Sequence, residues 1–183
     1  MNRDNQQERL VKESILNIPE HIGWYLSGFS DGEGSFNISF RHKSDYKRKW
    51  QPVLSFNVSQ KDITVLEIMQ KYLRCGIIKQ RKDGLYSYDV TNPQALATNI
   101  VPFFQKYILF SLSKRKNFHL FQKAVELMFC KKHLTLEGLR EIVEIRENIN
   151  EGRGRKRKYS KKDILLESSE THTPTSKSNL EMI

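Results

Sequence analysis

The stretch "WYLSGFSDGEGSFNIS", Trp24 to Ser39, changes its structural period around a group of glycines. It begins with apolar residues at helical spacing and ends in the alternation of apolar and polar residues that is typical of a strand. Between these parts, Gly28–Gly34 holds three glycines and the acids Asp31 and Glu33. The stretch therefore predicts a helix that passes directly into a strand, with two carboxylates at the junction.

The predicted helix starts at Pro19, a good first helical residue because its missing N–H needs no partner there. Small residues recur four apart along it, as Gly23 with Ser27 and Gly28 with Gly32. Small residues at this spacing allow a second helix to approach closely. They are equally compatible with a helix end that glycine merely loosens, so the residues alone leave both interpretations open.

Two predicted hairpins follow the pattern of alternating residues. Apolar and polar residues alternate from Ser35 onward and again from Gln51 to Ser59, on either side of a polar loop at Lys43–Lys49. Asp83-Gly84 is a strong turn pair and predicts a second hairpin with strands over 77–82 and 85–91. The outward face of the four strands is expected to carry Ser35, Asn37, Ser39, Arg41, Lys43, Gln51, Val53, Ser55, Asn57, Lys79, Arg81, Ser87 and Asp89.

Helical spacing predicts further helices over 62–74, 94–109, 114–129 and 136–149. Asp62 and Thr135 are expected N-caps, and Ser160 with Asp163 forms a capping-box variant before a short last helix. The order is α-β-β-α-β-β-α-α-α. We expect one domain over 17–167, an N-terminal arm at 1–16 and a disordered, Ser/Thr-rich tail at 168–183.

The charge balance indicates a polyanionic partner. The 183 residues carry a net charge of +10, with a pI of about 9.6. Lys and Arg neutralise phosphates and release counterions, although a merely soluble basic protein remains an alternative on charge alone. The outward strand residues include Asn, Gln and Arg, which can make paired hydrogen bonds to a base edge. A sheet with this face could lie in a DNA major groove, the alternative being an ordinary solvated face.

Several classes of protein are disfavoured. Cys75 and Cys130 stand far apart with no C-x-x-C, so we expect neither a disulfide nor a cysteine metal site. The five histidines show no pair at ligand spacing, which argues against zinc. No apolar run reaches the length of a membrane span, and Asp4, Glu8 and Glu13 argue against a targeting peptide. We therefore expect no membrane partner.

The segment "YLSGFSDGEG", Tyr25 to Gly34, resembles the LAGLIDADG motif of homing endonucleases. The resemblance extends to "FNVSQKD", which is similar to the family's second strand, and to "LSKRKNF", which is similar to its basic segment before a helix. "HLTLEGLREIVEIRENIN" resembles its late helix, so that the similarity covers about residues 17–165. Only one copy of the motif is present, as in the single-motif members that work as homodimers.

The resemblance implies an α+β fold of the α-β-β-α-β-β-α type. Its four-stranded antiparallel sheet would form a DNA-binding saddle, with helices on the other face. Two motif helices would pack at a two-fold axis, the second one coming from a second chain. The implied interface residues are Gly23, Ser27, Gly28, Asp31 and Gly32.

The resemblance also implies the catalytic groups. Glu33 and the carbonyl of Gly32 would bind Mg²⁺, with Mn²⁺ able to substitute and Ca²⁺ able to bind without supporting cleavage. Gln60 would hold a water, and Lys114 would stabilise developing negative charge. Some relatives have an Arg where this chain has Thr64, so Lys61 or Arg115 would compensate, or the water network would differ.

Asp31 is expected to have a different role from Glu33. An Asp between a helix end and glycine commonly serves as a cap or turn former. By resemblance, Asp31 would help to tie the two motif-helix ends together.

The run from Arg153 to Lys162 is dense in positive charge and lies between two predicted helices. Phosphate contact is the favoured interpretation, against a flexible charged tail or a nuclear-localisation-like string. The candidate backbone contacts are Lys61, Arg115, Lys116, Arg155, Lys156, Arg157 and Lys158.

These expectations lead to a site-specific double-stranded DNA endonuclease. By resemblance it would cut a long, near-palindromic target with 3′ overhangs and promote intron homing. The alternatives are a maturase that binds intron RNA and a DNA-binding regulator with an inactive nuclease core. We expect an intracellular protein of an organelle, chloroplast or mitochondrion, or of a bacterial cytoplasm, and not a secreted one.

Overall fold

The computed structural model of the chain describes residues 17–150 and 157–169. The elements are α2 (Glu20–Glu33), β1 (Gly34–His42), β2 (Trp50–Gln60), α3 (Thr64–Leu73), β3 (Ile77–Gln80), β4 (Tyr86–Val90), α4 (Pro93–Ala95), the π-turn η1 (Leu96–Ile100), α5 (Val101–Lys106), α6 (Leu112–Phe129), the 3₁₀ turn η2 (Lys132–Leu134), α7 (Leu136–Asn148) and α8 (Lys161–Ser169). This order confirms the predicted α+β succession. The predicted arm at 1–16 lies outside the described residues.

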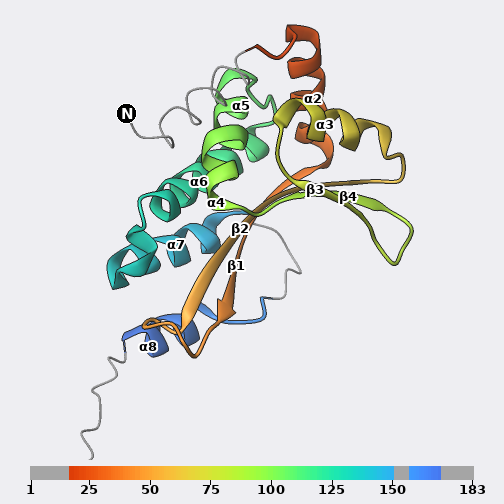
Figure 1. Cartoon of the computed structure of the whole chain (residues 1–183). Helices are drawn as coiled ribbons and strands as arrows, with labels where there is room; N and C mark the ends of the chain where they lie inside the picture. Colours follow the sequence, from red (N-terminus) through yellow and green to blue (C-terminus); the bar gives the residue numbers. More distant parts are fainter. Residues whose placement is uncertain (1–16, 151–156, 170–183) are drawn as a thin grey trace, which may run out of the picture.

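The four strands form one antiparallel sheet in the order β1-β2-β4-β3. The β3–β4 hairpin turns at Gly84, whose φ of +83° lies in the left-handed region that glycine adopts without strain. Helices α6 and α7 lie against β1, with α8 near the loop end of the β1–β2 hairpin (Figure 1). The other face of the sheet carries the polar residues of the predicted DNA-reading surface.

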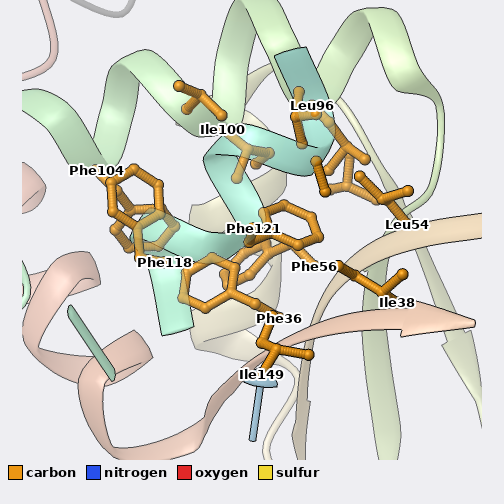
Figure 2. Close-up of a cluster of buried hydrophobic side chains, with 14 of the residues drawn as sticks. Phe36, Ile38, Leu54, Phe56, Leu96, Ile100, Phe104, Phe118, Phe121 and Ile149 are labelled. Atoms are coloured by element: carbon orange, nitrogen blue, oxygen red, sulfur yellow. The ribbon is translucent and has the colours of Figure 1, made fainter. Parts of the chain in front are cut away.

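Aromatic side chains fill the space between the sheet and the helices. The ring of Phe36 lies 5.2–5.6 Å from four other phenylalanine rings, which come from β2, α5 and α6 (Figure 2). Burying one such ring stabilises the fold by about 1.5–3 kcal/mol. Since Phe36 is only three residues beyond Glu33, the core fixes the strand that leads directly out of the motif.

The chain does not form one regular helix over 94–109, and the helical segment ends earlier than predicted. A π-turn separates α4 from α5, with the Val101 N–H donating to the carbonyl of Leu96, and the helix stops at Lys106. Pro102 has no N–H to donate, and the wider turn just before it accommodates the proline ring. The residues after Lys106 therefore form a loop that leads to α6.

Two local caps match their predictions. The Thr135 hydroxyl accepts a hydrogen bond from the Gly138 N–H (3.0 Å) at the start of α7. Ser160 and Asp163 form a reciprocal capping box at the start of α8.

The disordered tail was predicted to begin at residue 168, which is too early. Ser168 and Ser169 belong to α8, and Ser168 is fully buried, because packing against Arg48 orders this polar segment. Residues 170–183 lie outside the described residues.

Replacing Gly23 by Ala should destabilise the protein. A Cβ at Gly23 would overlap the ring of Tyr107, so the expected loss is about 1–3 kcal/mol in the free energy of unfolding. Urea titration at equal protein concentration measures it. His21→Ala, at an exposed position of the same helix, is the control and should stay within about 0.5 kcal/mol. Equal stability of the two variants would contradict the packing described here.

Candidate active site and nucleic-acid interface

The junction between α2 and β1 contains no loop. The Gly34 N–H donates to the Ser30 carbonyl as the helix ends, and a Cβ at Gly34 would lie 2.6 Å from that carbonyl oxygen. Only glycine fits here, because any side chain would collide with the backbone of the preceding turn. Glu33 is the last helical residue and is exposed. Within the described residues, its carboxylate makes no hydrogen bond or ion pair.

Lys114, in the first turn of α6, reaches this junction from 80 residues away. Its ammonium donates to the carbonyl of Gly34. Partial burial lowers the pKa of Lys114 from its ordinary value, although the nearby Asp31 and Glu33 carboxylates act in the opposite direction. A cation and two acids therefore meet at the end of the motif helix, as predicted for Glu33 and Lys114.

Asp31 connects the end of α2 to the start of α6. One of its carboxylate oxygens accepts from the backbone N–H of Ser111 (2.9 Å) and from the Ser111 hydroxyl (2.8 Å). A negative charge at a helix N-terminus is favourable because it meets the positive end of the helix dipole. Asp31 therefore does cap a helix, but it caps α6, which carries Lys114, and not the end of its own helix as expected. A contact of Asp31 across a dimer stays a prediction.

The predicted start of α6 is two residues too late. Sequence reasoning placed it at Lys114, whereas Ser111 precedes the first helical residue, Leu112. Serine is a preferred residue at this position, so the signal was present in "SLSK".

Two of the five predicted interface residues are not available to a second helix. Gly23 packs against Tyr107, and the Ser27 hydroxyl donates to the Tyr107 carbonyl (2.8 Å), so both residues face the chain's own interior. In contrast, Gly28 and Gly32 are exposed, and a Cβ added to either would meet no atom within 4 Å. Gly28 and Gly32 therefore form a glycine face that is open to a second helix. Gly23 and Ser27 lie on a different side of α2.

An exposed apolar surface adjoins this glycine face. It consists of Trp24 and Tyr25 of α2 and of Ile108, Phe110 and Leu112, and we call it the α2 apolar surface. Phe110 and Leu112 are 68% and 79% exposed, and the ring of Trp24 lies 5.9 Å from that of Phe110. Apart from Tyr25, which begins the motif, sequence reasoning did not single out these residues, although the apolar run "YILFSL" between two helices was a visible signal.

Gln60 lies at the same end of the sheet as Glu33. Gly34, the first residue of β1, pairs with Val58, so β2 continues two residues past the start of β1 and ends at Gln60. The side-chain oxygen of Gln60 accepts from the N–H of Lys61 (2.9 Å). The register thus brings Gln60 to the junction, while its contact with a water stays a prediction.

The outward face of the sheet is polar, as predicted. Asn37 donates to the hydroxyl of Ser35 (3.0 Å) and lies near the side-chain oxygen of Asn57 (3.4 Å). The side chains of Lys79 and Asp89 form an ion pair (2.6 Å). The remaining residues on this face that are at least partly exposed are Ser39, Arg41, Lys43, Gln51, Val53, Ser55 and Arg81.

The prediction that Ser87 is accessible on this face is wrong. Ser87 has the expected orientation, but it is only 4% exposed, because its neighbours across the sheet, Ser59 and Lys79, crowd it. A base edge therefore has no access to Ser87 in this arrangement.

Two predicted phosphate contacts are engaged in hydrogen bonds within the chain. Arg157 donates to the carbonyls of Arg146 and Glu147 and pairs with the Glu147 carboxylate. Arg115 donates to the carbonyls of Leu109 and Phe110. Both guanidinium groups therefore support their own loops. Arg157 is nevertheless exposed, as are the candidates Lys61, Lys116 and Lys158, while Arg155 and Lys156 lie outside the described residues.

The junction fits a hard divalent cation only in part. No group of three or more His, Cys, Asp or Glu side chains that could hold a metal ion occurs within residues 17–150 and 157–169. The exposed Glu33 carboxylate and the backbone of Gly32 offer oxygen ligands, which suit Mg²⁺ together with waters. One chain thus supplies part of a coordination shell, and a second copy of the junction would double it.

Comparison with known proteins identifies the family. The model described as LAGLIDADG endonuclease matches residues 26–125. The chain belongs to the LAGLIDADG endonuclease family. The matched region contains Asp31, Glu33, Gln60 and Lys114. No described helix of this LAGLIDADG chain is long and apolar enough to cross a membrane.

Similar proteins show how this family unit is used. "Probable intron-encoded endonuclease 2" of Neurospora crassa is 34% identical over 145 residues, which are 77% of this chain and 32% of that protein. The chain thus spans about a third of that relative. The archaeal intron-encoded homing endonuclease I-Vdi141I, solved in complex with DNA, matches with a TM-score of 0.75 and 26% identity over 81% of this chain and 95% of its own.

I-SmaMI, solved with an uncleaved DNA target in the presence of calcium ions, matches with a TM-score of 0.68 and 38% identity. The match covers 72% of this chain and 46% of I-SmaMI. The same structural unit therefore corresponds to nearly all of one solved relative and to about half of another.

Replacing Asp31 by Ala should weaken the connection between α2 and α6. The variant loses both hydrogen bonds to Ser111, so we expect a loss of about 0.5–2 kcal/mol in the free energy of unfolding, as for other helix caps. Urea titration measures the change, and Asp31→Asn, which keeps an oxygen acceptor, should lose less. If Asp31→Ala is as stable as the parent protein, this cap contributes nothing to the fold.

Proposed function

We propose that this protein is a site-specific DNA endonuclease that works as a homodimer and depends on a divalent metal. The observation that carries the proposal is the exposed Glu33 carboxylate beside Lys114, at the end of a polar sheet face. A free acid next to a partly buried cation at one end of a DNA-sized surface suits phosphodiester hydrolysis. Family membership and the DNA complexes of I-Vdi141I and I-SmaMI support the same substrate.

The homodimer completes the site. One chain provides a single Glu33, and the hydrolysis of two strands requires two such junctions. The open Gly28 and Gly32 would let two α2 helices lie in contact, and the α2 apolar surface would be removed from water at the same time. A closed two-fold arrangement uses the same surface on both chains. The match to nearly all of I-Vdi141I and about half of I-SmaMI agrees with a two-unit enzyme.

The metal would be held at the centre of this dimer. The Glu33 carboxylate and the Gly32 carbonyl of each chain are the proposed ligands for Mg²⁺, with Mn²⁺ as a substitute and Ca²⁺ as a binding but inactive ion. When bound, a divalent cation lowers the pKa of a coordinated water and stabilises the charge of a leaving oxygen. It would also relieve the repulsion between two Glu33 carboxylates at two helix C-termini.

The protein's own groups would perform the remaining tasks. Gln60 would orient the attacking water by hydrogen bonding, and Lys114 would stabilise the negative charge that develops on the phosphate. Within its own chain, Asp31 would hold the start of α6, and with it Lys114, against the junction. Asp31 is therefore a positioning residue.

The polar sheet face would read the target. The side chains of Asn37, Arg41, Gln51 and Asn57 can contact base edges, while Lys61, Lys116 and Lys158 can contact phosphates. A symmetric dimer would recognise a near-palindromic sequence. As in the family, we propose 3′ overhangs, a role in intron homing and an organellar or bacterial host.

Glu33→Gln should abolish cleavage while preserving DNA binding. The test is to incubate the protein with Mg²⁺ and a plasmid that carries the insertion site of its own intron, with the intron absent. We expect the parent protein to linearise the plasmid and the variant to cut at least about 100-fold more slowly, because a metal ligand supplies several kcal/mol to the transition state. Binding in Ca²⁺ should change less than about threefold, since other residues make the DNA contacts.

Retained cleavage by Glu33→Gln would remove this residue from the metal site. If the parent protein makes no double-strand cut and instead accelerates splicing of the intron RNA, the maturase alternative replaces the endonuclease. Specific DNA binding without either activity would indicate the regulator.

Gly28→Leu should separate the dimer without unfolding the chain. A side chain at Gly28 enters open space in the monomer but would block the close approach of a second α2. We expect the dimer dissociation constant to rise at least about tenfold, which corresponds to 1.4 kcal/mol. Sedimentation equilibrium measures it, with Arg140→Leu at an exposed position of α7 as the control. A Gly28→Leu protein that still sediments as the parent dimer would exclude this face as the interface.

A further inference from the structure

The outer half of the β1–β2 hairpin extends beyond the rest of the sheet. β1 pairs with β2 from Gly34↔Val58 to His42↔Trp50. β4 pairs with β2 only from Phe56 to Gln60, so no third strand supports β2 between Trp50 and Ser55. A two-stranded ribbon is marginally stable in water, and it needs packing against another element to keep its shape.

Helix α8 provides that packing at the loop end of the hairpin, far from α2 (Figure 1). Arg48, in the hairpin loop, donates to the carbonyl of Ser168 (3.1 Å). The Ser168 hydroxyl donates to the carbonyl of Ile164 and also lies 3.3 Å from the carbonyl of Arg48. His42, the last residue of β1, lies 3.2 Å from the Glu167 carboxylate. Ile164 is fully buried. These contacts connect the end of β1 and the hairpin loop to one short helix.

The segment just before α8 extends the same support. The ring of Tyr159 packs edge-on against that of Trp50, with ring centroids 4.6 Å apart, and Trp50 is 3% exposed. The guanidinium of Arg146, in the last turn of α7, lies over the ring of Phe40 at 5.1 Å. Every one of these hairpin contacts uses the apolar side of the ribbon.

The other side of the ribbon is left open. Ser39, Arg41 and Gln51 point away from α8 by strand alternation, and each is at least partly exposed. The register places Arg41 directly opposite Gln51. Two side chains suited to paired hydrogen bonds with bases therefore lie side by side on a ribbon whose back is held by α8.

We propose that α8 sets the sequence specificity of the outer part of each half-site by holding this hairpin end in position. The inference rests on the proposed DNA-binding function and deepens it. The eight steps from Gly34 to His42 span about 27 Å at 3.4 Å per residue. This length corresponds to about eight base pairs at 3.4 Å each. The residues held by α8 thus read base pairs far from the cut, where Glu33 and Lys114 make no contribution.

The experiment compares binding preferences along the target. The full-length parent protein and its Ile164→Ala variant select, in Ca²⁺, from a duplex library randomised over about 24 base pairs, which covers two half-sites of the estimated length. Sequencing of the bound fraction gives the base preference at each position. The selection works without a defined target sequence and without cleavage, because it scores binding alone.

We expect Ile164→Ala to lose its preference only at the outer positions. A paired hydrogen-bond contact gives a preference of about 5- to 150-fold for the correct base, and this should fall toward one at the two or three outermost positions. Preferences near the centre should stay within about twofold, because α2, Gln60 and the inner strand residues are unchanged. Loss of stability alone would lower the bound fraction uniformly and leave the profile intact.

Two further substitutions in α8 serve for comparison with Ile164→Ala. Leu166→Ala, on the exposed side of the same helix, should give the parental profile. Ser168→Val removes the hydroxyl that lies beside the carbonyl of Arg48, and it should give a weaker form of the Ile164→Ala result. An unchanged profile for both Ile164→Ala and Ser168→Val, or a loss spread over all positions, would overturn the proposal. Failure of the parent protein to select any sequence would instead contradict the proposed DNA-binding function.

Discussion

The direct passage from helix to strand at Gly34 is the constraint on which the rest of this structure depends. The turn is so tight that a Cβ would collide with the Ser30 carbonyl. It places Glu33 at the last position of a helix and Phe36, the centre of the aromatic core, three residues later. Lys114 closes the arrangement by donating to the Gly34 carbonyl. A single backbone geometry thus joins the candidate catalytic acid, its cationic neighbour and the hydrophobic core.

Local patterns predicted much of the fold because their causes are local. The period of two defined β1 and β2, the Asp83-Gly84 pair defined the second hairpin, and hydroxyl caps marked the start of α7 and α8. Glu33 and Lys114 were placed together by the family resemblance, and the structure brings both to the junction. These features need no information about distant parts of the chain.

The errors concern contacts between distant segments. Whether Gly23 and Ser27 face inward depends on Tyr107, which lies 80 or more residues away and follows a helix that ended earlier than predicted. The pairing of Arg157 within the chain depends on Glu147, and the burial of Ser87 depends on its cross-strand neighbours. Residue type and spacing describe which groups are available. They do not describe which partner each group finds in the folded chain.

The open glycine face of α2 has a consequence for how activity would respond to the amount of protein. A site assembled from two identical halves forms in proportion to the square of the chain concentration when chains are scarce. Such an enzyme would be nearly silent at low expression and would gain activity steeply as copies accumulate. In a covalently joined pair of the same units, both halves would always be present, and activity would rise only linearly with dose. Gly28 and Gly32, which carry no side chain, would thereby set a threshold for DNA cutting in the host.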